Sequence, residues 1–227
     1  MPTYIGLQLM IEISQHKQNI IGASSAIAEL EKKDHARLLV ISDSHGRYGV
    51  LEAIVRGYGA KCDALIFCGD GVSDIAQLLY AQKGDKKLAD CIPPVIAAVR
   101  GNCDPSNYPI DKGSLYFSEL VELKVNGRGI LVTHGHNQGV DFGVDNLGLE
   151  MQVSECTTAF YGHTHIAREE NIGNYKFVNP GSCARPRGGQ AAGFAIATVE
   201  KSFVDVAFIK MEMNSDGVTE YKIWNPM

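Results

Sequence analysis

The sequence predicts a mixed α/β fold, and three observations support this prediction. Apolar runs at 38–41 and 64–68 are not interrupted by polar residues, which indicates strands that are buried on both faces. Helical stretches separate these runs, which gives the β-α-β-α-β order of a parallel sheet. The second half of the chain is rich in strands that pair across short turns. We therefore expect a parallel sheet followed by antiparallel pairs.

The first half of the chain predicts an N-terminal extension and then alternating strands and helices. Residues 1–36 form the extension, which is partly helical because residues 24–33 combine Ala, Leu and Glu with lysines near the end. Residues 37–227 are expected to form a single domain. Its first elements are predicted as strand 38–42, helix 47–59, strand 64–68, helix 73–83 and strand 95–99.

The second half begins with a hairpin signal. Asn126-Gly127 favours a type I′ turn between strands at 115–125 and 128–133. The elements after this hairpin are predicted as a helix near 145–156, a strand at 159–161, a hairpin at 167–178, a turn at 179–182 and strands at 193–199 and 203–211.

Composition excludes several classes of protein. The chain has 227 residues and 45% hydrophobic residues, but no apolar run long enough to span a membrane. Its net charge of −5 argues against generic nucleic-acid binding. The start of the chain lacks the basic region of a secretion signal, and the six cysteines form no C-x-x-C pair. We therefore expect reduced thiols and a cytoplasmic protein.

Polar residues follow the predicted strands, and together they predict a metal site. Each motif alone is common in turns, but five of the seven histidines fall in these motifs. Carboxylate and imidazole ligands suit Mn²⁺, Fe or Zn²⁺. The motifs are Asp43-x-His45, Gly69-Asp70, Gly101-Asn102, His134-Gly135-His136, Gly162-His163-x-His165 and the turn Asn179-Pro180-Gly181-Ser182.

In this order the motifs resemble those of the calcineurin-like metallophosphoesterases. The Asn-Pro-Gly-Ser segment and the small size resemble the prokaryotic YfcE-type phosphodiesterase branch of that superfamily. The resemblance covers residues 37 to about 212 and does not reach residues 1–36. It implies a four-layer αββα sandwich, in which two mixed β-sheets are flanked by helices and a two-metal centre lies at the strand ends.

The resemblance also implies a ligand set for two divalent metal ions, with Mn²⁺ expected and Fe, Zn²⁺ or Ni²⁺ as alternatives. Asp70 would bridge the two ions, and a hydroxide between them would attack phosphorus in line. The first ion would take Asp43, His45, Asp70 and His165, and the second would take Asp70, Asn102, His134 and His163. Asp70, Asn102 and His134 are therefore also expected to be catalytic.

Cys103, Arg185 and Arg187 are candidates for substrate binding and His136 is a candidate catalytic residue, each with open alternatives. Many superfamily members have a histidine after Gly-Asn, whereas this chain has Cys103, as the YfcE-type branch tends to have. A thiol is a poor proton donor at neutral pH. His136 either takes that catalytic role, or binds phosphate, or only supports the ligand His134. Arg185 and Arg187 either bind the phosphate of the substrate or lie in a solvated loop.

These observations predict a phosphodiesterase that acts on a small phosphate ester. The first alternative is a phosphomonoesterase acting on a nucleotide or phosphoprotein. The second is a non-catalytic protein-interaction scaffold, because the same fold serves that role in a retromer subunit with an impaired metal site. Apolar residues in the N-terminal extension favour a homo-oligomer.

Overall fold

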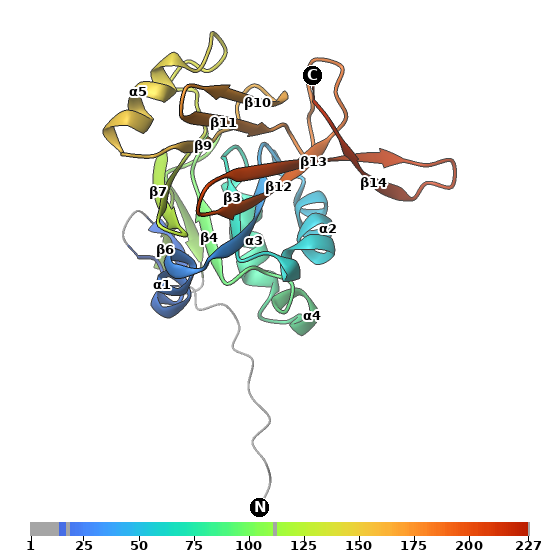
Figure 1. Ribbon diagram of the computed structural model, residues 1–227. Coiled ribbons are helices and arrows are strands. Elements are labelled where there is room, and N and C mark those ends of the chain that lie inside the picture. The colour runs from blue at the N-terminus through green and yellow to red at the C-terminus, as the bar shows by residue number, and fades with distance from the viewer. Residues whose placement is uncertain (1–13, 17–18, 111–112, 227) are drawn as a thin grey trace, which may run out of the picture.

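The computed structural model describes residues 14–16, 19–110 and 113–226. Its strands form two mixed sheets and one two-stranded ribbon (Figure 1). The first sheet has the strand order β1 (Ile21–Gly22), β4 (Val95–Ala98), β3 (Ala64–Phe67), β2 (His35–Ile41), β12 (Gly193–Glu200), β13 (Val204–Met213) and β14 (Thr219–Trp224). The second has the order β10 (Ala167–Ile172), β11 (Tyr175–Pro180), β9 (Thr158–Phe160), β8 (Arg128–Thr133) and β7 (Leu120–Val125).

The helices are short and lie around these sheets. They are α1 (Ser24–Lys32), α2 (Tyr48–Tyr58), α3 (Val72–Ala81), α4 (Lys86–Ala89) and α5 (Asp145–Val153), with a 3₁₀ turn η2 at Gly59–Lys61. The separate ribbon pairs β5 (Asn107–Ile110) with β6 (Gly113–Tyr116). In the described part of the chain, no helix is both long and apolar enough to cross a membrane.

Three apolar cores separate four layers of structure. Leu38 and Val40 of β2 pack between the sheets, together with residues of β7 and β8. Leu39 and Ile41 of the same strand face the other way and pack against α2 and α3. This division follows from the alternation of side chains along a strand. A third core joins the second sheet to α5 through residues such as Leu147. The expected αββα sandwich is therefore confirmed.

The predicted parallel unit is present, because β2, β3 and β4 pair in parallel. The turn between β7 and β8 has positive φ at both Asn126 (52°) and Gly127 (70°), as a type I′ turn requires. The predicted turn at 179–182 is wrong in its first half. Asn179 and Pro180 end β11, where they pair with Arg168 and Ala167 of β10.

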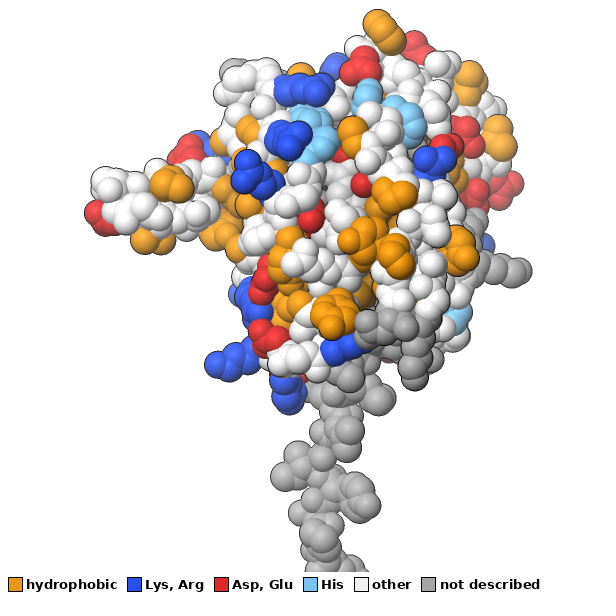
Figure 2. Space-filling view, turned by 180° about the vertical axis from the view of Figure 1, so that it is seen from behind, with side chains coloured by type: hydrophobic (Ala, Val, Ile, Leu, Met, Phe, Trp, Pro, Cys, Tyr) orange, Lys and Arg blue, Asp and Glu red, His pale blue; other side chains and the backbone are white. Residues whose placement is uncertain are grey.

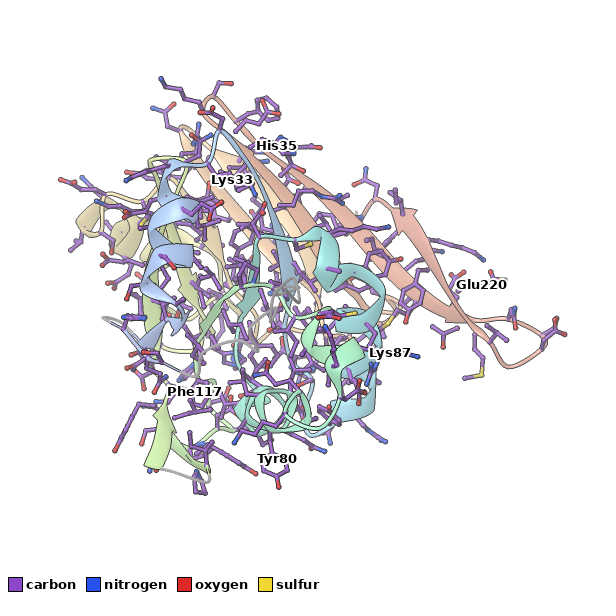
Figure 3. The ribbon with its side chains drawn as sticks, turned by 90° about the horizontal axis from the view of Figure 1, so that it is seen from below. Lys33, His35, Tyr80, Lys87, Phe117 and Glu220 are labelled. Carbon is purple, nitrogen blue, oxygen red and sulfur yellow. The ribbon has the colours of Figure 1, made fainter. Side chains whose placement is uncertain are left out.

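Residues before 37 contribute to both the sheet and the core. The short strand β1 pairs with β4, and Leu30 of α1 is buried between the sheets. Figure 3 shows Lys33 and His35 close together near the start of β2. Lys33 forms an ion pair with Asp63 at 2.6 Å. The apolar residues that favour an oligomer lie largely within 1–13, outside the described residues.

The topology brings five loops to one end of the sandwich. The loops after β2, β3 and β4 leave the same edge of the first sheet, since these strands run in parallel. Strands β8 and β9 are also parallel, so their loops leave one edge of the second sheet. Every predicted metal ligand lies in one of these five loops. This is the edge where open α/β sheets place their ligand sites.

Candidate metal centre

The first predicted set of ligands is tightly clustered. Asp43, His45, Asp70 and His165 each offer one ligand atom, and these atoms all lie within 4.8 Å of one another. The Nε2 atoms of His45 and His165 are 3.0 Å apart, and His165 Nε2 lies 3.3 Å from Asp43 Oδ1. Two imidazole nitrogens and two carboxylates thus face a single point.

The second predicted set lies beside the first and shares Asp70 with it. Asn102 Oδ1 is 3.1 Å from both His134 Nε2 and His163 Nδ1. Asp70 Oδ1 lies 3.5 Å from His134 Nε2, whereas its Oδ2 lies 3.7 Å from His45 Nε2. Asp70 therefore stands between the two sets, with one oxygen toward each.

The donor atoms fit cations. Asp43 is fully buried, and neither of its carboxylate oxygens has a hydrogen-bond partner within the described residues. A buried carboxylate in that condition needs a positive partner. The Nδ1 atom of His134 donates to the carbonyl of Cys68 at 2.7 Å, and that of His165 donates to the carbonyl of Arg185 at 2.6 Å. Each Nε2 therefore presents a lone pair to the centre.

The protonation states at neutral pH suit metal binding at two of the ligands. Burial opposes ionisation of Asp70, but the neighbouring His134 ring and the hydrogen bond from the Cys103 amide lower its pKa well below the usual value. Burial lowers the pKa of His45, which favours the neutral imidazole. His165 behaves differently, since burial lowers its pKa but the Asp43 carboxylate raises it more. Protons therefore compete with the cation for His165.

Most of the ligands lie on backbone that non-glycine residues rarely adopt. Left-handed φ values cost energy for residues with a Cβ atom and are common at functional sites. Five ligands have such values, which are 55° for Asp43, 45° for His45, 55° for Asp70, 69° for His163 and 60° for His165. Each turn aims its side chain back toward the point where the strands end.

The Asn-Pro-Gly-Ser segment holds these turns in place. Asn179 donates to the carbonyl of Gly162 at 2.7 Å and to Thr164 Oγ1 at 3.1 Å, on either side of His163. Ser182 Oγ donates to the carbonyl of Asp43 at 2.7 Å. This short segment therefore fixes ligand loops from both sheets.

Glycines allow the loops to approach one another. A Cβ atom on Gly101 would lie 2.1 Å from Asp70 Oδ1, and one on Gly162 would lie 2.8 Å from Asp43 Oδ2. Real Cβ atoms are not found so close to other heavy atoms. The glycine of the Gly-Asn motif is thus required by the Asp70 carboxylate. That of the Gly-His motif is required by Ser42 Oγ, which would lie 2.1 Å from the Cβ atom, as well as by Asp43.

Two further carboxylates support the ligand loops. Asp104 accepts hydrogen bonds from the amides of Gly71, Val72 and Gly101, which follow or precede ligands. Asp74 accepts from Ser44 Oγ at 2.5 Å and from the amide of Gly46 at 3.0 Å. The two contacts of Asp74 therefore hold the residues on either side of His45 in the chain.

Asp141 contacts one of the predicted ligands, and the sequence pattern did not indicate it. Its Oδ2 lies 2.8 Å from His163 Nε2. The imidazole therefore donates through Nε2 and turns Nδ1 toward Asn102. Asp141 comes from the loop before α5, twenty-two residues before His163, and no local motif marks it.

The remaining candidates lie near the metal ligands. The ring of His136 is 5.4 Å from that of His134 and 6.1 Å from that of His163, and its Nδ1 is buried without a hydrogen bond among the described residues. The amide of Cys103 donates to Asp70 Oδ1 at 2.9 Å. Partial burial and the Asp70 carboxylate raise the pKa of the Cys103 thiol to about 11.

The two arginines follow the segment that holds the loops. The carbonyl of Arg185 accepts from His165, and the amide of Arg187 donates to the carbonyl of His165 at 3.1 Å. Both side chains are exposed, and neither guanidinium has a hydrogen bond or ion pair with another described residue. Figure 2 shows histidine side chains gathered on one face, with Lys and Arg side chains beside them.

Known proteins share both the sequence pattern and the fold. Residues 37–202 match the calcineurin-like phosphoesterase superfamily domain. The chain is 30% identical over 171 residues to a probable metallophosphoesterase, YsnB, of Bacillus subtilis, which covers 75% of this chain and 89% of YsnB. It is 27% identical over 168 residues to the phosphodiesterase YfcE of Escherichia coli, which covers 70% of this chain and 86% of YfcE.

A solved structure agrees with these matches. The crystal structure of a predicted phosphoesterase from Streptococcus pneumoniae superimposes with a TM-score of 0.60 at 26% identity. The superposition covers 85% of this chain and 99% of the other. The four-layer arrangement described above is thus shared by a protein of similar size.

Proposed function

The chain belongs to the calcineurin-like phosphoesterase superfamily, and we propose that it hydrolyses small phosphodiesters at a centre of two divalent metal ions. It is a metal-dependent hydrolase of phosphoric ester bonds, as its relatives YsnB and YfcE are named. We further propose the number of ions, their identity and the roles of single residues.

The observation that carries the two-ion proposal is the position of Asp70. One of its oxygens faces His45 and the other faces His134, at 3.7 and 3.5 Å. A carboxylate in this position suits a bridge between two cations, since it offsets their repulsion. The first ion would be held by Asp43, His45, Asp70 and His165, and the second by Asp70, Asn102, His134 and His163.

The ions would supply positive charge for the phosphate and lower the pKa of a bound water. Mn²⁺ is the expected ion, and Fe, Zn²⁺ and Ni²⁺ suit the same imidazole-rich set. Asn102 is a neutral ligand, so the centre keeps a positive charge toward an anionic substrate. The backbone of Arg185 and Arg187 contacts His165, and their guanidinium groups, unpaired among the described residues, can bind the phosphate oxygens.

Proton transfer to the leaving group is assigned to His136 rather than to Cys103. The pKa of the Cys103 thiol is raised to about 11, which makes the thiol a weak acid at neutral pH. His136 stands beside His134 and His163 with a ring nitrogen that no described residue contacts by a hydrogen bond. Burial lowers the pKa of His136, so its ring is mostly neutral at neutral pH, but its protonated form would be a stronger acid than the Cys103 thiol.

The test compares two aryl substrates with metal added to the purified protein. With Mn²⁺ the protein should hydrolyse bis(4-nitrophenyl) phosphate, and chelation with EDTA should abolish turnover. Asp70→Asn removes the bridging charge and should lower kcat/KM about 100-fold or more. Glu29→Gln, an exposed position on α1, is the matched control and should keep full activity.

Other outcomes of this assay decide between the alternatives. Faster hydrolysis of 4-nitrophenyl phosphate than of the diester would identify a phosphomonoesterase. No metal-dependent turnover of either ester would favour the non-catalytic scaffold. A cytoplasmic location is also proposed, because all six cysteines are free thiols.

A further inference from the structure

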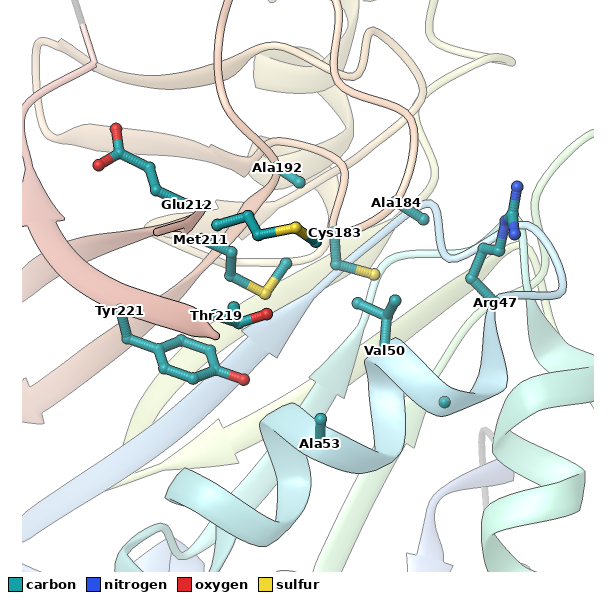
Figure 4. A pocket seen from close by; sticks show the side chains of 12 residues that line it. Arg47, Val50, Ala53, Cys183, Ala184, Ala192, Met211, Glu212, Thr219 and Tyr221 are labelled. Atoms are coloured by element: carbon teal, nitrogen blue, oxygen red, sulfur yellow. The ribbon is translucent and has the colours of Figure 1, made fainter. Parts of the chain in front are cut away.

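We propose, on the basis of the proposed phosphodiesterase function, that a cavity beside the metal centre binds the nucleoside of a nucleoside phosphodiester. The cavity has a volume of about 500 Å³ and lies between α2 and the β13–β14 hairpin (Figure 4). This size is within the range of small-molecule sites. Its lining is largely apolar and includes Val50, Ala53, Ala192, Met211, Met213 and Tyr221.

The rim of the cavity is joined to the metal ligands on two sides. Arg47 lines the cavity and follows His45 by two residues, so their Cα atoms are at most about 7.6 Å apart. Ala184 also lines it and precedes Arg185, whose carbonyl is 2.6 Å from His165 Nδ1. Ser182 Oγ accepts from the Ala184 amide at 3.1 Å. A substrate held at the metal centre can therefore extend into the cavity.

Charge at the cavity separates an anionic end from a neutral interior. Arg47 is exposed, and its guanidinium has no hydrogen bond or ion pair with the rest of the described chain. It therefore offers a free cation to a phosphate at the rim. Glu212 is the acidic group in the lining, and it is paired with Lys210 at 2.6 Å and Lys222 at 3.2 Å. The interior therefore suits an uncharged group.

The far wall favours an aromatic ring. Tyr221 is held edge-on by Tyr58, with ring centroids 5.4 Å apart, and lies 6.1 Å from Phe194. It is thus a rigid surface. Met211 and Met213 add thioethers, which adapt their shape and contact aromatic rings favourably. The hydroxyl of Thr219 adds a polar group to the same wall.

The position of the rim selects a nucleoside over a simple aryl ester. Arg47 and Ala184 stand between the metal ligands and the cavity, so a ring inside it needs a spacer from the phosphorus. A nucleoside has such a spacer in its sugar, whereas the ring of a phenyl ester is attached directly. Aryl diesters should therefore be hydrolysed without use of the cavity.

The far wall belongs to a part of the chain that the superfamily domain does not cover. The match to that domain ends at residue 202, whereas Met211, Met213, Thr219 and Tyr221 all follow it. Figure 3 shows Glu220 on the β13–β14 hairpin, which projects from the body of the molecule. This hairpin forms one side of the cavity. The nucleoside preference therefore depends on a segment that follows residues 37–202, the part of the chain that matches the superfamily domain.

Filling the cavity tests the proposal. Ala53→Phe places a ring in the space opposite Tyr221. It should raise KM for thymidine 5′-(4-nitrophenyl) phosphate about tenfold and leave hydrolysis of bis(4-nitrophenyl) phosphate within about twofold. Val153→Phe, at an exposed position on α5, should change neither rate. An unchanged KM for the nucleoside ester in Ala53→Phe would overturn the proposal.

A binding measurement keeps the test decisive if Ala53→Phe disturbs both reactions. Wild-type protein with ¹³C-labelled methionine methyl groups is titrated with thymidine 5′-monophosphate. The methyl signals of Met211 and Met213 should shift, and that of Met151, on the buried face of α5, should not. No shift at either methionine overturns the cavity proposal. Failure of the wild type to hydrolyse bis(4-nitrophenyl) phosphate with Mn²⁺ overturns the proposed function instead, and the titration distinguishes the two.

Discussion

His163 Nε2 lies 2.8 Å from Asp141, and this single contact sets which nitrogen of the ring faces the centre. His134 and His165 are oriented in the same way, because backbone carbonyls accept hydrogen bonds from their Nδ1 atoms. In each case the partner of one ring nitrogen prepares the other to bind a cation. At the scale of the residue, the proposed centre would therefore depend on groups that do not themselves contact a metal ion.

Removal of the Asp141 carboxylate should weaken metal binding without loss of the fold. In Asp141→Ala the His163 ring loses the partner that orients it, so the dissociation constant for Mn²⁺ should rise by about 10- to 100-fold. Titration calorimetry on metal-free protein measures this constant. Asp145→Ala, an exposed residue in the first turn of α5, is the control, and equal affinities in the two variants would contradict the orienting role.

Burial of a thiol predicts a loss of stability in alkaline solution. Burial raises the pKa of Cys62 from 9.0 to about 11, so the folded protein keeps this proton where the unfolded chain loses it. The contribution is complete below pH 9 and is lost as the pH rises toward about 11. Urea unfolding of wild type and Cys62→Ala between these pH values should show the wild type losing stability faster. Parallel pH profiles for the two proteins would refute the effect.

At the scale of the element, the ligand loops are packed so closely that side chains would not fit between them. Gly101 follows β4, and Asp70 follows the neighbouring strand β3. The Cα atom of Gly101 occupies the space beside the Asp70 carboxylate. The Gly-Asn motif is thus a consequence of two parallel strands that end side by side.

Adding a methyl group at Gly101 should disrupt the centre. Gly101→Ala brings Cβ to 2.1 Å from Asp70 Oδ1, so Asp70 must move and metal-dependent hydrolysis should fall below detection. Gly57→Ala on α2 is the matched control, since its Cβ would meet nothing within 4 Å. It should keep activity and gain up to about 1 kcal/mol in the free energy of unfolding. Thermal melts and the diester assay check both variants, and activity retained in Gly101→Ala would contradict the packing argument.

The elements that the sequence predicts well are those with strong local patterns. Strands β2, β3 and β4 have continuous apolar runs, and the helices between them have clear amphipathic spacing. The predicted single strand at 115–125 is wrong in its first part, because Leu115 and Tyr116 belong to β6 and pair with β5, and β7 begins only at Leu120. The ribbon β5–β6 has no clear local pattern, since β5 holds Pro109 and both strands are only four residues long. Strand β14 alternates weakly and pairs on one side with β13, so its place depends on the preceding strand rather than on its own residues.

At the scale of the whole molecule, the core between the sheets draws on the N-terminal extension as well as the catalytic domain. Leu30 of α1 is only 2% exposed and belongs to that core. The helix lies over β7, at an edge that would otherwise leave the core open. We therefore propose that residues 20–36 fold as one unit with the domain, although the match to the superfamily begins only at residue 37.

Truncation of Leu30 should test this view. Leu30→Ala leaves a cavity at the edge of the core and should lower the free energy of unfolding by about 2–5 kcal/mol. Glu29→Ala, exposed on the same helix, should change it by less than about 0.5 kcal/mol. Urea denaturation of both variants gives the comparison. If Leu30→Ala matched Glu29→Ala, the extension would be peripheral.

The sequence predicts the motifs that form the site, but it does not predict the residues that hold these motifs in position. All seven proposed ligand residues follow strands, so a pattern in the sequence marks them. Asp141 and the cavity beside α2 depend on contacts between distant segments, namely residues 141 with 163 and 47–53 with 211–221. Such contacts are set by the packing of the four layers, which local patterns do not encode.

The left-handed turns at five ligands have a consequence for the history of such a protein. A left-handed backbone costs an ordinary residue about 1–2 kcal/mol, and glycine or asparagine avoids much of that cost. A change such as His45→Gly or His165→Asn would therefore relax the chain while it removes a ligand. A gene copy no longer selected for hydrolysis could gain stability at each step in which it loses its metal.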